Sequence, residues 1–150
     1  MPVDSIQNGS FLLCESVRSG FALAPSLIRR FGLAGALKTL LKLSSRSRKF
    51  YCVLLDCGIV NYGWVNLSFC RHYDVSEGDV VIGPVWTDPA FRRRGMAVYG
   101  IKMLVNEMFS RGYSVFFIDT AETNLPMQKV ISKCGFGAPV SSYERNGDIR

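Results

Sequence analysis

The chain has 150 residues, of which 48% are apolar and 20% are charged, enough for one globular domain that folds without a disulfide or a metal ion. Its formal net charge of +6 favours an anionic partner such as a phosphate, a nucleotide, a nucleic acid or a membrane surface. The composition excludes disordered and collagen-like chains, and no apolar run approaches the ~18 residues of a membrane-spanning helix.

The cysteines and the N-terminus indicate where the protein resides. The five cysteines are odd in number and form no Cys-x-x-Cys pair, which is typical of reduced thiols. Asp4, Gln7 and Asn8 stand where a secretory signal would be basic and then apolar. We therefore expect a cytoplasmic protein with a single domain over residues 1–150 and no membrane span.

The chain begins with a predicted strand followed by a basic helical segment. Residues 10–17 form an apolar run between two glycine-containing turns, which predicts a strand. Residues 25–43 carry apolar side chains at helical spacing on either side of Gly32, so we expect two short helices. Lys38 and Lys42 share the polar side of the second helix. Its apolar stripe predicts core packing, and a helix lying on a membrane surface is a second interpretation.

A hairpin is predicted next. Residues 50–56 and 59–69 have the composition of two strands joined by a short turn. The polar loop at 71–78 contains the only histidine, His72. Before the hairpin, residues 29–49 hold seven basic side chains and no acidic one, which a solvated surface and an anionic partner explain equally.

The central part of the chain predicts a strand, a helix and another strand. The strand at 79–87 contains Gly83-Pro84, and since proline cannot donate to a sheet ladder, we expect a bulge or a separation from a neighbour there. The helix at 98–111 leads to an apolar strand at 113–119. In such a βαβ unit the two strands are parallel.

A last helix is predicted near the C-terminus. Asn124 or Thr123 can cap its start, and Gly135 ends it. The tail from residue 138 allows one strand and an Asn-Gly turn, with only residues 148–150 left for a returning strand. Together, the elements predict one α/β domain of the α+β class.

A basic turn connects the central strand to the helix that follows it. Its residues are Arg92, Arg93, Arg94, Gly95, Met96 and Ala97. The glycine lets a ligand approach the backbone, the small alanine keeps the first helical turn open, and N–H groups at a helix N-terminus bind anions. The turn therefore predicts a phosphate-binding site, and a loop whose arginines only face solvent is the alternative.

Other chemistries fit the sequence less well. The lone histidine and the scattered cysteines lack metal-ligand spacing, so no metal is expected, and no glycine-flanked serine indicates a serine hydrolase. Gly95 and Gly100 are spaced as in a Walker A loop, but Ile101 replaces its lysine, and Gly-x-Gly-x-x-Gly is absent. Basic and aromatic residues are not interleaved on one strand, which disfavours nucleic acid as a partner.

Two motifs resemble those of the GCN5-related N-acetyltransferase (GNAT) family. The family's acetyl-CoA loop, Arg/Gln-x-x-Gly-x-Gly/Ala, is matched by Arg92, Gly95 and Ala97. An asparagine-led helix that ends in Gly-Phe is matched from Asn124 to Phe136. The two motifs occur in the family's order with a βαβ unit between them.

The resemblance extends over residues 50–136 and implies a splayed, mixed sheet with helices on both faces. The strand at 79–87 would separate from the strand at 113–119, and coenzyme A would lie in the gap. Backbone N–H groups of residues 93–97 would bind its pyrophosphate, and Asn124 would contact its middle.

The resemblance also implies how the thioester is held and attacked. The pantetheine arm would pair with Val85, Trp86 and Thr87 like an added strand. A backbone N–H of Val85 or Trp86 would polarise the thioester carbonyl while an acceptor amine attacks it in a ternary complex. The implied activity is acetyl transfer from acetyl-CoA to the amine of a small acceptor.

Three side chains are candidates for the general base that takes the proton of the amine, directly or through a water. Asp119 ends its strand, Glu122 lies in the loop beyond, and His72 is more distant. Each also has a purely structural explanation, because Asp119 can fix the strand end, Glu122 can favour a helix N-terminus, and His72 can simply be exposed.

The chain departs from the family pattern in two places. Ile131 occupies the position where the family usually has a tyrosine that protonates the departing thiolate. The short C-terminus leaves the acceptor side open, or completed by a second subunit in a homodimer. The basic helices at 25–49 would occupy the part of the family fold that usually forms the acceptor wall, so an anionic acceptor, such as a nucleotide-linked amino sugar, is expected. A non-catalytic domain that binds coenzyme A or an anionic surface is the alternative function.

Overall fold

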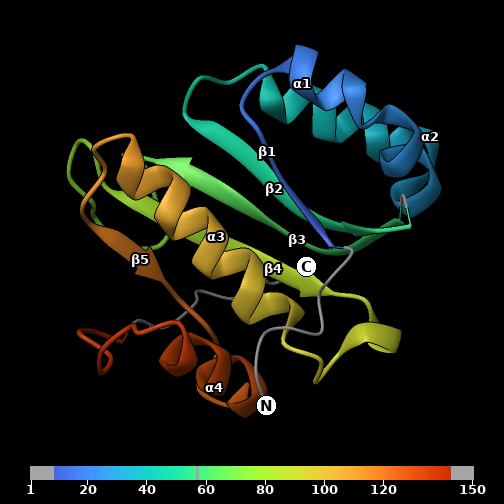
Figure 1. The fold of residues 1–150 in the computed structure, drawn as a ribbon. Coiled ribbons are helices and arrows are strands. Elements are labelled where there is room, and N and C mark those ends of the chain that lie inside the picture. Colours follow the sequence, from blue (N-terminus) through green and yellow to red (C-terminus); the bar gives the residue numbers. More distant parts are fainter. Residues whose placement is uncertain (1–8, 57, 143–150) are drawn as a thin grey trace, which may run out of the picture.

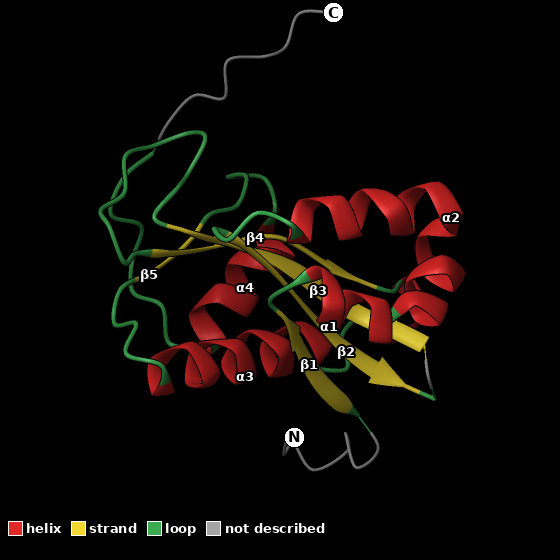
Figure 2. Cartoon of the chain, turned by 90° about the horizontal axis from the view of Figure 1, so that it is seen from above, coloured by secondary structure: helices red, strands yellow, loops and turns green. Residues whose placement is uncertain are grey.

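The computed structural model describes residues 9–56 and 58–142, which form a mixed sheet covered by helices on both faces (Figures 1 and 2). The strands are β1 (Ser10–Cys14), β2 (Arg48–Leu55), β3 (Gly58–Leu67), β4 (Val80–Thr87) and β5 (Phe116–Ile118). The helices are α1 (Val17–Ala22), α2 (Ala24–Leu43), α3 (Met96–Ser110) and α4 (Leu125–Lys133), with a 3-10 turn η2 (Pro89–Phe91) before α3. This is the α+β architecture that the sequence predicts.

The sheet has the strand order β1-β2-β3-β4-β5. The pairs from β1 to β4 are antiparallel, and β4 pairs with β5 in parallel through the crossover helix α3. The predicted hairpin and the predicted parallel pair are both confirmed. The last strand is shorter than the predicted 113–119, because only Phe116–Ile118 find partners on β4.

Two apolar cores lie on opposite faces of the sheet. On one face α2 packs against β2 and β3, and α1 packs against α2 and β1, with a core that contains Leu23, Leu27, Ala36, Leu40, Leu43, Phe50 and Cys52. On the other face α3 and α4 pack against the sheet, with a core that contains Tyr51, Val65, Val80, Ile82, Ile101, Leu104 and Met108. Figure 2 shows the sheet between these two helical layers.

Helix α2 is broken at Gly32, where φ is +71° and ψ is 174°, so the predicted division into two helical pieces is confirmed. The prediction that the apolar stripe of the second piece packs into the core is wrong for three leucines. Leu33, Leu37 and Leu41 are 74%, 56% and 63% exposed. The second piece instead buries Ala36, Leu40 and Leu43, because apolar residues occur on both of its sides and the sheet covers only one.

Two glycines allow α3 to approach the sheet closely. A Cβ on Gly63 would lie 2.5 Å from the ring of Tyr51, and a Cβ on Gly100 would lie 3.0 Å from the same ring. Without these side chains, the tyrosine ring fills the space between β3 and α3 and is fully buried. Burial raises the pKa of its hydroxyl well above the ordinary value, so Tyr51 stays neutral.

The C-terminal tail contributes no strand over its described residues, 138–142. The predicted Asn-Gly turn at 146–147 and the returning residues 148–150 lie outside the described residues. Among the helices that the structure describes, none is both long enough and apolar enough to cross a bilayer.

Candidate functional site

The sheet opens between β4 and β5. The two strands pair from Val80 to Ile82, and among the described residues no strand pairs with this edge of β4 beyond Ile82. The separation occurs at Gly83-Pro84, as the sequence predicts. On the other edge, the pairing of β4 with β3 shifts register between Gly63 and Val65.

This register shift changes which way the side chains of β4 point. Ile82 and Val85 are three residues apart, yet both pack into the core under α3 and α4. In a regular strand they would lie on opposite faces, so the bulge has reversed the alternation. As a result, Trp86 points to the α2 face, where its ring stacks on Tyr62 with centroids 5.3 Å apart.

The backbone of β4 beyond the bulge presents hydrogen-bonding groups to the opening. The Asp88 N–H donates to the Val60 carbonyl at 2.8 Å, and Trp86 pairs with Tyr62 in the same ladder. Because peptide groups alternate along a strand, the peptide of Trp86 also faces β3, whereas those of Val85 and Thr87 face the opening. Of the two N–H groups that the sequence left as alternatives, only that of Val85 faces the gap.

A buried asparagine holds this strand end in place. Asn61 on β3 is fully buried, and its amide donates to the Trp86 carbonyl at 2.7 Å and to the Thr87 hydroxyl at 3.0 Å. This residue was not predicted as important from the sequence. Its signal was an amide side chain among the apolar residues of a predicted strand, because a polar group that becomes buried needs a partner.

The basic turn leads from β4 into α3 with its backbone N–H groups uncovered. Arg93 has φ +61° and Gly95 has φ +81°, and Gly95 occupies the N-cap of α3 without any side-chain cap. The first N–H groups of the helix, beginning with Met96 and Ala97, therefore have no intrahelical acceptor. The side chain of Met96 is buried in the core, so only its backbone can contact a ligand.

The three arginines of the turn are exposed. The Arg92 Nε reaches back to the Thr87 carbonyl at 3.4 Å, and the Arg94 guanidinium lies 5.5 Å from the centre of the Phe91 ring. The turn thus sets three cations around the N-terminus of α3, where the partial positive charge of the helix already favours an anion.

Helix α4 begins at Asn124, whose side chain accepts a hydrogen bond from the Met127 N–H at 3.2 Å. This confirms the predicted cap and selects Asn124 over Thr123. The helix packs beside α3, and the Cys134 thiol lies 3.8 Å from the Val98 carbonyl. Ile131 is half-buried.

The three candidate general bases come from different segments of the chain. Asp119 follows β5 directly, and its Oδ1 lies 3.7 Å from where a Cβ on Gly83 would stand. Glu122 is exposed in the next loop, where its backbone carbonyl accepts a hydrogen bond from the Gln128 side chain at 2.6 Å. His72 is exposed in the loop between β3 and β4. The structure therefore places Asp119 at the point where β4 and β5 part.

A model of the acetyltransferase (GNAT) family matches residues 32–136, well over half of the chain. The chain belongs to the GNAT family. A comparison with curated protein sequences finds no match.

Solved structures share the GNAT fold at low sequence identity. AAC(6')-Iy bound to the bisubstrate analogue CoA-S-monomethyl-acetylneamine is 17% identical with a TM-score of 0.64, and the match covers 92% of this chain and 99% of that chain. The ribosomal-protein-alanine N-acetyltransferase of Brucella melitensis biovar Abortus 2308 is 16% identical with a TM-score of 0.64, covering 93% and 99%. A predicted acetyltransferase of Clostridium acetobutylicum, solved with acetyl-CoA, is 17% identical with a TM-score of 0.59, covering 92% and 96%.

The α2 face of this GNAT sheet carries an aromatic wall beside the opening. The Arg30 guanidinium lies 3.6 Å from the centre of the Trp86 ring, and the Phe31 ring meets Tyr62 edge-on at 5.0 Å. A cation stacked on an indole in this way contributes about 0.5–2 kcal/mol. From the sequence, only the backbone of Trp86 was predicted to belong to the cofactor site, and the aromatic wall was not predicted. Its signal was the pair of aromatic side chains at alternate positions of β3, Tyr62 and Trp64.

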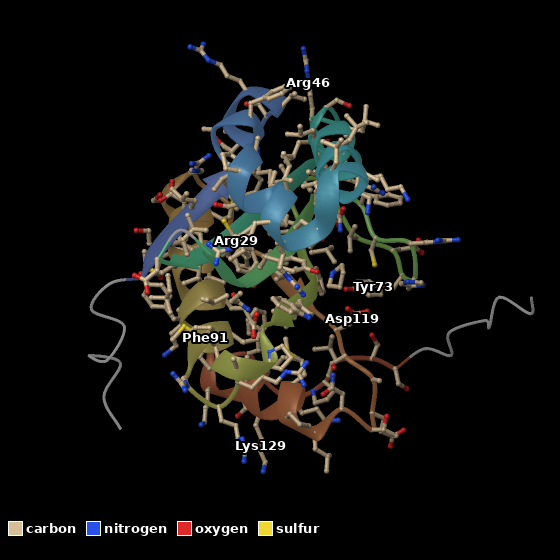
Figure 3. The ribbon with its side chains drawn as sticks, turned by 90° about the vertical axis from the view of Figure 1, so that its right-hand side faces the viewer. Arg29, Arg46, Tyr73, Phe91, Asp119 and Lys129 are labelled. Carbon is tan, nitrogen blue, oxygen red and sulfur yellow. The ribbon has the colours of Figure 1, made fainter. Side chains whose placement is uncertain are left out.

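Tyr73, which was not predicted as a site residue from the sequence, lies on the α2 face of the sheet as well. The Tyr73 ring is 6.0 Å from the ring of Phe117 on β5. Because Phe117 and Asp119 are two residues apart, their side chains project to one side of the strand. Figure 3 accordingly shows Tyr73 next to Asp119, so the loop between β3 and β4 borders the opening.

No group of three histidine, cysteine or acidic side chains could hold a metal ion in the part of the chain that the structure describes.

Proposed function

We propose that this GNAT protein is an acetyl-CoA-dependent N-acetyltransferase that moves an acetyl group to the amine of a small acceptor in a ternary complex. One observation carries the proposal: the edge of β4 that is unpaired among the described residues leads, through η2 and the basic turn, to the uncapped N-terminus of α3. An unpaired edge suits an extended chain of amides, and an uncapped helix N-terminus suits a phosphate. Acetyl-CoA has both features, in this order from its thioester to its pyrophosphate.

Each part of the cofactor has a place along this path. N–H groups of residues 93–97 bind the pyrophosphate, and Arg92, Arg93 and Arg94 attract it over a longer range. The peptides of Val85 and Thr87 pair with the pantetheine arm, and Asn124 lies near its middle. The neighbouring structures that were solved with coenzyme A or acetyl-CoA support this assignment.

With acetyl-CoA in this orientation, its thioester lies near Gly83-Pro84, where β4 and β5 separate. The Val85 N–H polarises the carbonyl as the acceptor nitrogen attacks it. The C–N bond forms, the C–S bond breaks, and coenzyme A leaves as a thiolate that takes its proton from water or from another donor than residue 131. Asp119 takes the proton from the amine, directly or through a water, and Glu122 is the second candidate. The distance of Asp119 from Gly83 supports this order of preference.

The acceptor is proposed to carry a negative charge, as a nucleotide-linked amino sugar does. The Arg30 guanidinium on the aromatic wall supports this, because it offers a cation beside flat apolar rings. Of the neighbouring proteins named above, AAC(6')-Iy is an aminoglycoside N-acetyltransferase and the Brucella protein is a ribosomal-protein-alanine N-acetyltransferase, so proteins with this fold accept very different amines. Turnover limited to cationic amines in a substrate panel would contradict an anionic acceptor.

The experiment that tests cofactor binding compares two glycine substitutions. Acetyl-CoA at ~100 times its Kd should stabilise the wild-type chain by about 2.7 kcal/mol, or roughly 5–10 °C in Tm. Gly95→Glu should abolish this shift, because it places a carboxylate at the pyrophosphate site. Gly112→Glu is the matched control, since Gly112 also has a positive φ, of +93°, in open space. Absence of any shift in the wild type at millimolar acetyl-CoA would refute the proposal.

A non-catalytic domain that binds coenzyme A or an anionic surface is the second candidate function. Ile131 favours it, because an isoleucine cannot protonate the departing thiolate. Release of free thiol from acetyl-CoA in the presence of any acceptor would dispose of this alternative.

The proposal includes a cytoplasmic location. Cys14, Cys52, Cys70 and Cys134 are free thiols in the described part of the chain, and free thiols suit a reducing compartment. A second subunit that closes the open acceptor side would make the active form a homodimer.

A further inference from the structure

The second piece of α2 carries a row of exposed leucines. Leu33, Leu37 and Leu41 are each more than half exposed, and their spacing of four residues aligns them along one side of the helix. We call this row the leucine ridge. Soluble monomers rarely leave such a contiguous apolar surface uncovered, so the ridge requires a partner.

Cations flank the leucine ridge. Lys38 and Lys42 each follow a ridge leucine by one residue, which places them about 100° further around the helix on its exposed side. Arg46 lies just beyond the end of α2, and Figure 3 shows it extending into solvent. Between Glu15 and Asp56 the sequence has eight basic residues and no acidic one.

An open groove of about 490 Å³ lies at the C-terminal end of the leucine ridge. It is lined by Leu41, Lys42, Ser45, Ser47, Arg48 and Phe69. Two cations and two hydroxyls suit the oxygens of a phosphate, and the leucine and the exposed phenylalanine provide an apolar border. This combination matches a lipid phosphate with hydrocarbon next to it.

We propose that the leucine ridge and its flanking cations bind the protein to an anionic lipid surface. The ridge enters the boundary between headgroups and acyl chains, and Lys38, Lys42 and Arg48 contact lipid phosphates. A second copy of the chain fits less well, because a symmetric interface would bring the two basic faces together. A partner helix needs an apolar groove, whereas the ridge is convex. This inference does not depend on the proposed acetyl transfer.

Flotation of the full chain with lipid vesicles tests the proposal. The chain should float with vesicles of phosphatidylcholine and phosphatidylglycerol at low salt, and not with phosphatidylcholine alone. The triple variant Leu33→Gln, Leu37→Gln, Leu41→Gln should weaken binding roughly tenfold or more. Lys38→Gln with Lys42→Gln should weaken it to a similar extent, and raised salt should have the same effect.

Matched controls use exposed side chains elsewhere. Phe109→Gln with Leu125→Gln removes comparable exposed apolar surface from α3 and α4, and Lys102→Gln with Lys129→Gln removes the same charge there. Both control proteins should bind vesicles as the wild type does. Unchanged Tm values of all variants would show that exposed substitutions leave the fold intact.

Four outcomes would overturn the proposal. They are no flotation with anionic vesicles at low salt, equal losses in the ridge and control variants, loss of binding in inorganic phosphate at an ionic strength at which chloride has no effect, and a concentration-dependent dimer that the ridge variant dissociates in the absence of vesicle binding. Binding to an acidic peptide without binding to vesicles would likewise replace the lipid surface with a protein partner.

Discussion

Asp119 and Glu122 are carboxylates in neighbouring positions of the chain, yet their surroundings differ. Asp119 stands at Gly83, where the sheet opens, while Glu122 is exposed in the following loop. A general base must reach the proton that it removes, so position decides between them before acidity does.

We predict that Asp119→Asn lowers kcat by about 10²–10⁴-fold, because the amide cannot take a proton. Glu122→Gln should change kcat by less than about threefold, since no reacting atom lies within its reach on this assignment. The measurement is steady-state kinetics over a range of pH, with the acetyl-CoA thermal shift retained in both variants as the control. A larger loss in Glu122→Gln than in Asp119→Asn would reverse the assignment.

The orientation of Trp86 could not be predicted from the sequence. The sequence places a bulge at Gly83-Pro84, but it does not say how the bulge resets the alternation of side chains. One residue of register decides whether the backbone of Trp86 faces the cofactor gap or β3. The same shift puts its indole on the α2 face beneath Arg30, a contact between residues far apart in the chain.

At the scale of elements, β4 has two edges with different hydrogen-bonding states beyond Ile82. The edge toward β3 is paired, and the edge toward β5 is unpaired among the described residues. The N–H groups of Val85 and Thr87 face the second edge, where a bound cofactor arm would pair with them.

We predict that acetyl-CoA slows hydrogen exchange of the Val85 and Thr87 amides and leaves the Trp86 amide unchanged. Trp86 pairs with Tyr62 of β3, and the alternation of peptide groups turns its N–H toward that strand, so its protection reports opening of the sheet rather than cofactor contact. Residue-resolved hydrogen exchange by NMR, with and without the cofactor, provides the measurement. Slowing at Trp86 alone would mean that the strand is turned the other way.

Helix α2 illustrates which properties of an element the sequence determines. Gly32 interrupts the helical pattern, so two pieces could be predicted and were found. The buried side of the second piece could not be predicted, because leucines occur around most of its circumference and hydrophobicity alone does not select a face. The position of the sheet selects Ala36, Leu40 and Leu43.

At the scale of the whole molecule, one carboxylate joins three distant parts. Glu15 follows β1 and pairs with Lys49 on β2 at 2.9 Å and with Arg111 at the end of α3. Arg111 also pairs with Glu107 at 2.7 Å. The hydrogen bond from Arg111, followed by Lys49, lowers the pKa of Glu15 from its ordinary 4.5 to about 2.

We predict that Glu15→Gln destabilises the fold at neutral pH by less than about 1 kcal/mol, because the carboxylate is partly exposed and screened by solvent. The folded pKa lies below the unfolded one, so this stabilisation is complete above pH 4.5 and disappears as the pH falls toward 2. Urea titrations of both proteins at pH 7, 4 and 2 would measure it, with Glu77→Gln as the control. A difference that grows on acidification would contradict the assignment.

The sequence predicted the order of elements, the parallel βαβ unit, the opening at Gly83-Pro84 and the cap at Asn124. Each of these depends on residues that are close together in the chain. The wall of Arg30 and Trp86, the buried Asn61 and the approach of Tyr73 to β5 each join segments that are far apart. Local patterns of charge and hydrophobicity carry no information on such distances.

The chain has two tryptophans, and each lies beneath a cation from α2. Arg30, before the kink at Gly32, covers Trp86 beside the candidate active site, and Lys42, after the kink, lies 5.2 Å from the ring centre of Trp64 near the leucine ridge. Indole emission is sensitive to a nearby charge. The protein thus carries two intrinsic fluorophores, each beneath a cation from a different piece of α2, and proteins that retain only one tryptophan would separate an optical signal of acceptor entry from one of lipid contact.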